Sequence, residues 1–132
     1  MDEIFKKMNI SQNTIAQMKE LNPNLDNVSK FKILQKIDIL QKENCDKIQI
    51  RNIISSNSLY LDRLNTDINN LIKKLKKYGF DNLDLLFDSN PYILNLDDFE
   101  IENYIKQQTE NGENIEDIID ELSSNPLLFN NI

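Results

Sequence analysis

The sequence of 132 residues contains no histidine, one cysteine, two glycines and three prolines. Without histidine, the Ser-His and Cys-His nucleophile pairs cannot form, and the commonest general base is absent. The single cysteine, Cys45, excludes an intramolecular disulfide framework and a cysteine-based structural zinc site. The two glycines occur in neither a Walker-type loop nor a GxGxxG motif. We therefore expect no catalytic role, no cofactor and no metal site.

Long apolar runs are also missing. No stretch approaches 18 uninterrupted apolar residues, so we expect no membrane span. The first seven residues lack both the apolar core of a signal peptide and the Arg- and Ser-rich character of a transit peptide. A cytoplasmic protein is the plain expectation. The frequent Ile, Asn and Lys are typical of an AT-rich genome, such as that of a bacterium or a mobile element.

The charge is distributed unevenly along the chain. The net charge is −7, but residues 1–80 carry 14 Lys/Arg and 9 Asp/Glu, whereas residues 81–132 carry one Lys and 13 Asp/Glu. The first part is therefore at +5 and the second at −12. If the chain is extended, these charges stay apart in space, and one end of the molecule is mildly basic while the other is acidic.

A short phrase recurs at near-constant spacing, in residues 21–25, 56–61, 89–94 and 124–129. Each copy contains an asparagine followed by apolar residues, and three of the four contain Asn-Pro. The spacings between these asparagines are 35, 33 and 35 residues. A fixed period in this range predicts a helical repeat array, in which each unit buries its apolar face against its neighbours. The residues that define the repeat are Pro23, Asn57, Gly79, Asn90, Pro91, Gly112, Asn125 and Pro126.

Within each repeat the sequence predicts a helix, a turn, a second helix and a short third helix. In the clearest repeat, Thr66 is predicted to cap the first helix and Gly79 to end it in the left-handed conformation that glycine tolerates. Asn82 is predicted to cap the second helix and Asn90 the third, with Pro91 at the first helical position. The neighbouring repeats have weaker versions of these signals: caps at Ser29 and Asn114, turns near Asn44 and Gly112, and a first helix with apolar Phe31, Ile33, Leu34, Ile37 and Leu40.

These signals predict an all-α fold, built as a short α-solenoid of three helix–helix–short-helix repeats. We expect a single domain over residues 1–132, with repeats at 28–62, 63–96 and 97–132. Residues 1–27 are expected to form a partial unit that caps the N-terminal end. Terminal units of repeat arrays are commonly atypical in this way.

One segment resembles a known repeat. Residues 75–80, Leu-Lys-Lys-Tyr-Gly-Phe, are followed twelve residues after Gly79 by Pro91-Tyr92-Ile93-Leu94. This pattern resembles the repeat of the mitochondrial transcription termination factor (mTERF) family, over residues 28–132 and best at 65–129. The resemblance implies a curved stack of triangular three-helix units. It also implies a concave face that, in the family, is basic and binds duplex DNA or RNA.

The densest basic cluster consists of Lys73, Lys74, Lys76 and Lys77. These lysines are candidate contacts for phosphates or another anionic partner, together with the two arginines, Arg51 and Arg63. A second explanation stays open, because cations in the last turns of a helix are also favoured by the helix dipole. A longer basic stripe is an extension of the same hypothesis; it would add Lys30, Lys32, Lys36, Lys42 and Lys47.

The acidic run Glu116, Asp117, Asp120 and Glu121 lies in a predicted helix and is a candidate docking face for a cationic protein. Three non-enzymatic functions remain open. We favour a regulatory or adaptor module with a protein partner, because the net charge is −7 and arginine is scarce. Nucleic-acid binding through the basic N-terminal part is the second. Head-to-tail self-association of the basic and acidic ends is the third.

Overall fold

The computed structural model describes residues 2–132, and in these residues every regular element is an α-helix or a 3-10 helix. The prediction of an all-α protein with a repeated helical pattern is therefore confirmed. The chain divides into two compact units, Met1–Arg63 and Leu64–Ile132. This boundary lies within one residue of the predicted junction between the repeats 28–62 and 63–96. Each unit contains two successive copies of one plan.

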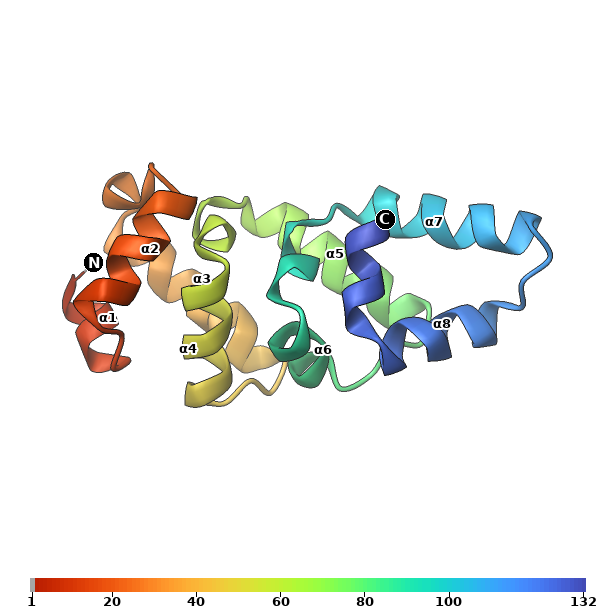
Figure 1. The fold of residues 1–132 in the computed structure, drawn as a ribbon, viewed down its shortest axis with the longest axis horizontal. Coiled ribbons are helices and arrows are strands. Elements are labelled where there is room, and N and C mark those ends of the chain that lie inside the picture. Colours follow the sequence, from red (N-terminus) through yellow and green to blue (C-terminus); the bar gives the residue numbers. More distant parts are fainter. Residues whose placement is uncertain (1) are drawn as a thin grey trace. The chain divides into compact units, whose positions relative to one another are not determined.

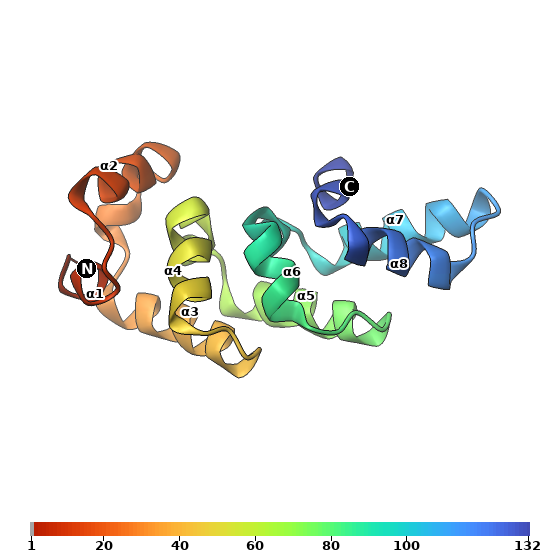
Figure 2. The same ribbon diagram turned by 60° about the horizontal axis from the view of Figure 1, so that its bottom comes forward.

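In unit 1 the plan of helix, second helix and 3-10 helix occurs twice. The helices α3 and α4 are joined by a short turn and pack against each other at an angle, and α2 packs against α4 (Figure 2). The elements of unit 1 are α1 (Asp2–Lys7), α2 (Gln12–Leu21), η1 (Leu25–Asn27), α3 (Lys30–Lys42), α4 (Lys47–Ser56) and η2 (Ser58–Asp62).

Unit 2 repeats the same order. Its two first helices, α5 and α7, pack against each other, and α7 and α8 run antiparallel on either side of a turn (Figure 1). The short third helices of the prediction are 3-10 helices in the structure. The elements of unit 2 are α5 (Asn65–Lys77), α6 (Leu83–Ser89), η3 (Pro91–Asn95), α7 (Asp98–Glu110), α8 (Ile115–Ser124) and η4 (Pro126–Asn131).

The predicted cap, residues 1–27, contains all three elements of the plan rather than a fragment of it. Its second helix, α2, has 10 residues, as have α4 and α8. Its first helix, α1, has 6 residues, whereas α3, α5 and α7 have 13 each. The N-terminal segment therefore contains a fourth copy of the plan.

One left-handed residue follows the first helix in all four copies, at Asn9, Asn44, Gly79 and Gly112, with φ values of 60°, 68°, 95° and 94°. Each lies two residues after the helix ends. Glycine and asparagine are the residues that adopt this conformation at low cost. In each turn the next N–H donates to the carbonyl five residues back, as in a Schellman motif. These bonds are Ile10 N to Phe5 O (3.0 Å), Cys45 N to Leu40 O (3.1 Å), Phe80 N to Leu75 O (3.1 Å) and Glu113 N to Gln108 O (3.1 Å).

Three of the predicted helix caps are confirmed by hydrogen bonds from backbone N–H groups to the capping side chain, as N-cap residues are expected to make. Pro91 also occupies the predicted first position of η3. The bonds run from Lys32 N to Ser29 Oγ (3.2 Å), from Tyr92 N to Asn90 Oδ1 (3.2 Å) and from Glu116 N to Asn114 Oδ1 (2.8 Å).

Two other predicted caps differ from the structure. The cap at Thr66 is wrong, because α5 begins at Asn65 and the N-cap residue is Leu64. Thr66 therefore lies inside the first helical turn. Asn82 does precede α6, but its backbone is left-handed, with φ of 49°, and its side chain makes no capping bond. The tertiary context therefore overrides the preference of a single capping residue at both helix starts.

The four repeat asparagines, Asn22, Asn57, Asn90 and Asn125, share one backbone conformation, with φ between −144° and −125° and ψ between 72° and 87°. Each N–H donates to the carbonyl four residues back, which closes the second helix. Each carbonyl accepts from the N–H three residues ahead, which opens the 3-10 helix. The recurring phrase therefore encodes the junction between these two helices.

The side chains of two repeat asparagines also join consecutive repeats within a unit. Asn22 Nδ2 donates to the Ser58 carbonyl at 3.1 Å, and Asn90 Nδ2 donates to the Pro126 carbonyl at 3.0 Å. Both acceptors lie 36 residues further along the chain, immediately after the next repeat asparagine. Ser58 returns a bond, because its Oγ donates to the Met18 carbonyl at 2.7 Å.

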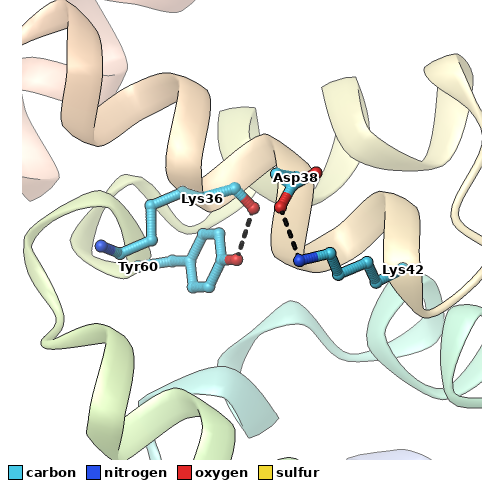
Figure 3. Close-up of polar contacts among 4 residues, drawn as sticks. All are labelled: Lys36, Asp38, Lys42 and Tyr60. Atoms are coloured by element: carbon cyan, nitrogen blue, oxygen red, sulfur yellow. Dashed lines mark hydrogen bonds and ion pairs between the residues drawn. The ribbon is translucent and has the colours of Figure 1, made fainter.

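The core of unit 1 contains a fully buried tyrosine, Tyr60, on η2. Its hydroxyl donates to the Lys36 carbonyl of α3 at 2.7 Å (Figure 3). On the surface of α3, Lys42 and Asp38 form an ion pair at 3.0 Å. Burial raises the pKa of the Tyr60 hydroxyl, and the negative charge that Cys45 acquires on ionisation raises it further.

The raised pKa of Tyr60 predicts a loss of stability in alkali. Below pH 10, the ordinary tyrosine pKa, Tyr60 is protonated in both the folded and the unfolded chain, and its contribution to the free energy of unfolding does not change with pH. Above it, the unfolded chain loses the proton while folded Tyr60 keeps it. Stability then falls by up to about 1.4 kcal/mol per pH unit through this group. Urea unfolding between about pH 9 and pH 11 should give a shallower decline for Tyr60→Phe than for the parent. Equal slopes would contradict the prediction.

Candidate functional site

A groove of about 660 Å³ opens between α1, α3 and α4 of unit 1. It lies beside α1, which has 6 residues and therefore spans less than half the length of the 13-residue α3. The floor of the groove is apolar, and it is formed by Ile4, Met8, Leu34, Ile37, Ile48 and Ile50.

The apolar residues of α3 divide between two faces. Ile33 and Leu40 are fully buried in the core. Leu34 and Ile37 line the groove, and the Leu34 side chain remains 48% exposed. Phe31 lies mostly in solvent. The sequence analysis treated all five residues as a single apolar group, but the structure separates core from groove.

Cations surround this apolar floor. Lys7, Lys30, Lys47 and Arg51 line the groove, and none of the described lining residues is acidic. Lys47 and Arg51 lie one turn apart on α4, next to Ile48, which is 61% exposed. Glu3, which does not line the groove, has its carboxylate 3.5 Å from Lys30 Nζ in an exposed pair. An apolar surface with this rim favours a ligand that carries apolar groups flanked by negative charge.

The predicted lysine cluster lies at the end of α5 in unit 2, and its four members differ in their contacts and exposure. Lys74 is turned toward α7, where its Nζ lies 3.5 Å from a Glu102 carboxylate oxygen. Lys77 Nζ lies 6.0 Å from the centre of the Tyr78 ring. Lys73 and Lys76 are exposed. Lys73, Lys76 and Lys77 are thus exposed, whereas Lys74 is half-buried and forms an ion pair within the unit.

The two arginines lie in unit 1, apart along the chain from that cluster. Arg51 belongs to the groove rim, and Arg63 is half-buried at the end of η2. The proposed basic stripe is broken at Lys36, which is buried. Burial lowers the Lys36 pKa, and the nearby charge of Lys32 lowers it further, against the opposing effect of Asp62.

The acidic candidates Glu116, Asp117, Asp120 and Glu121 are all exposed on α8, opposite its buried apolar side. Of these four, Glu121 lies near Tyr104, whose pKa is raised first by burial and then by the charges of Glu121 and Glu113. Among residues 2–132, no group of three or more His, Cys, Asp or Glu side chains is arranged to hold a metal ion. In the same residues no helix is both long and apolar enough to cross a membrane.

The sequence analysis missed the groove because its lining comes from three helices. Lys7 and Met8 drew no attention as functional residues. A usable signal was present in α3, because six apolar residues in 13 are more than one narrow core stripe needs. Comparison with known proteins adds no further assignment: no family model, curated protein or solved structure matches this chain.

Proposed function

We propose that this protein is a non-enzymatic regulatory or adaptor module that binds a protein partner through the groove of unit 1. One observation carries the proposal: exposed apolar residues are gathered in a groove whose charged rim is entirely basic. The ligand that fits is an amphipathic helix, with apolar side chains entering the groove and acidic residues beside the rim. Binding a helix in a groove is a common mode of peptide recognition.

The apolar floor favours protein over nucleic acid. Burial of a leucine or isoleucine side chain contributes about 1.5–3 kcal/mol when it is complete. A bound helix with leucine side chains on one face would bury Leu34 and Ile48. A phosphate backbone would form ion pairs with the basic rim but leave the apolar floor exposed to water. The rim then supplies orientation and a faster association rate.

The architecture proposed for this module is the α-solenoid, and its location is the cytoplasm. The solenoid is supported by the asparagine bonds that join consecutive repeats inside each unit. The resemblance to the mTERF repeat is consistent with such a stack, and it remains a prediction. Nucleic-acid binding is the second candidate function, supported by Lys73, Lys76 and Lys77, which are exposed on α5.

The test is a fluorescence-anisotropy titration with a labelled acidic amphipathic peptide of about four helical turns. A scrambled peptide of the same composition is the control for charge alone. We expect saturable binding at micromolar concentrations for the first peptide only. Leu34→Asp and Arg51→Glu should each weaken it by about tenfold or more. Leu85→Asp, which changes an exposed leucine in unit 2, should leave it unchanged.

The same titration with duplex DNA and with RNA separates the two candidate functions. Nucleic-acid binding requires affinity that falls steeply between about 50 mM and 200 mM salt, because phosphate contacts release counterions. It also requires loss of binding when Lys73, Lys76 and Lys77 become glutamate. Equal binding of both peptides, or tight binding of a duplex alone, contradicts the groove proposal.

A further inference from the structure

Unit 2 contains a cleft of about 300 Å³ between the turn that follows α5 and the second helix of the next repeat, α8. It is lined by Tyr78, Gly79, Ile115, Glu116, Ile119 and Asp120. All of these residues belong to unit 2, so the cleft is complete within that unit. The lining combines apolar side chains with two carboxylates, and none of the described lining residues is a cation. The exposed Lys77, whose Nζ lies 6.0 Å from the centre of the Tyr78 ring, does not line the cleft.

The cleft occupies the same place in the repeat plan as the groove of unit 1. Both lie beside the turn after a first helix and against the second helix of the following repeat. When the left-handed turn residues are aligned, five lining positions of the groove correspond to five of the cleft. The pairs, with the groove residue first, are Met8 and Tyr78, Asn9 and Gly79, Lys47 and Ile115, Ile48 and Glu116, and Arg51 and Ile119. The repeat plan therefore forms an open surface at this place in both units.

The side chains at the paired positions differ in charge between the two units. The two cations of α4 at these positions are replaced on α8 by Ile115, which is 43% exposed, and Ile119, which is half-buried. Glu116 takes the place of an exposed isoleucine, and Asp120 follows it by one helical turn. The cleft of unit 2 therefore has an acidic rim beside apolar side chains, whereas the rim of the groove is basic.

The position of Asp120 argues against a purely structural role for the acidic rim. Carboxylates in the first turn of a helix are favoured by the helix dipole, which accounts for Glu116 and Asp117. Asp120 lies beyond that turn, where the dipole has little effect. In the part of the chain that the structure describes, neither Glu116 nor Asp120 forms an ion pair. Both carboxylates are therefore open to a ligand.

We propose that the cleft of unit 2 binds a basic amphipathic helix of a second protein partner. Charge complementarity selects this occupant, because residues 64–132 carry 14 Asp/Glu and 5 Lys/Arg, a net charge of −9. The spacing of the carboxylates selects a helix. Glu116 and Asp120 lie one turn apart on α8, so they match two Lys or Arg side chains one turn apart on a ligand helix. An apolar side chain between these cations enters the cleft and contacts the isoleucines of α8.

The two sites make the chain an adaptor with two ligands of opposite charge. The cleft is smaller than the groove, at about 300 Å³ against about 660 Å³. The first helix α7 contributes no lining residue, since it packs against the 13-residue α5. The basic ligand is therefore held by few apolar side chains and by exposed ion pairs, and its affinity is sensitive to salt. The cleft and the groove share no lining residue, so the two ligands bind independently.

The test is a fluorescence-anisotropy titration with a labelled peptide of about four helical turns, in which Lys and Arg flank one apolar face. A scrambled peptide of the same composition is the control for charge alone. We expect saturable binding of the ordered peptide at micromolar concentrations. Glu116→Lys and Ile115→Asp should each weaken it by about tenfold or more. Asp117→Lys is the matched control, because it makes the same charge change in the same helical turn but outside the cleft. It should weaken binding by no more than about twofold.

Several outcomes overturn the proposal once circular dichroism shows that each variant is helical. One is the absence of saturable binding at about 50 mM salt, where electrostatic attraction is least screened. Equal binding of the scrambled peptide, or equal weakening by Glu116→Lys and Asp117→Lys, would show that a diffuse acidic surface explains the binding. Self-association in sedimentation equilibrium that Ile115→Asp abolishes would show that a second copy occupies the cleft.

The groove variants separate this proposal from the proposed function. Leu34→Asp and Arg51→Glu should leave binding of the basic peptide unchanged, because neither residue lines the cleft. Glu116→Lys should likewise leave binding of the acidic peptide to the groove unchanged. Loss of basic-peptide binding in the groove variants would place that peptide on unit 1 and would overturn the assignment of the cleft.

Discussion

Replacement of Asn90 by alanine is expected to lower the free energy of unfolding by about 3 kcal/mol. The Asn90 side chain is buried and accepts the Tyr92 N–H. It also donates to the Pro126 carbonyl and to Asn130 Oδ1, both at 3.0 Å. Alanine removes all three bonds and leaves the part-buried Tyr92 N–H and Pro126 carbonyl without these partners, which adds a desolvation cost to the loss of the bonds.

The matched control is Asn125→Ala, because Asn125 has nearly the same backbone conformation but an exposed side chain. We expect a change within about 0.5 kcal/mol. Urea unfolding followed by circular dichroism measures both variants. Similar losses for the two variants would show that the asparagine acts through its backbone conformation and that the bonds between repeats contribute little.

Replacement of Ile33 by alanine is expected to cost about 2–5 kcal/mol of unfolding free energy. Ile33 is fully buried in unit 1, so the smaller side chain loses transfer free energy and leaves a cavity. The next residue, Leu34, lines the groove and is 48% exposed. Leu34→Ala should therefore cost much less, about 1 kcal/mol or below.

The two α3 variants also separate stability from binding. Leu34→Ala is expected to weaken peptide binding in the anisotropy assay while the protein remains folded. Ile33→Ala should bind the peptide normally wherever it is folded, because Ile33 does not line the groove. If Leu34→Ala is as destabilising as Ile33→Ala, Leu34 belongs to the core, and the division of α3 into two faces is wrong.

Much of the fold could be predicted because short local sequence patterns mark the turns and helix starts of each repeat. Gly79 and Gly112 mark left-handed turns, and the Asn-Pro phrase marks the start of a 3-10 helix. Asn9 was missed although it lies 35 residues before Asn44, because an isolated asparagine is a weaker turn signal than glycine. Thr66 was misassigned because a good capping residue does not by itself decide where a helix begins.

The groove depends on relations between distant residues, so it is harder to predict. The place of α1 as the first helix of a repeat is visible in the sequence only after the four turns have been aligned. The asparagine side chains Asn22 and Asn90 bond to carbonyls 36 residues away. The packing of the repeats determines these partners, and no local sequence pattern predicts them.

The proposal that the groove of unit 1 is the binding site is tested most directly by mapping the amphipathic peptide on the protein by NMR. In two-dimensional ¹⁵N–¹H spectra, we expect saturable shifts for the amides of α1, α3 and α4 near Leu34, Ile48 and Arg51. We expect little change in α5 and α8. Shifts confined to the lysines of α5, or to the acidic face of α8, would contradict the assignment of the groove.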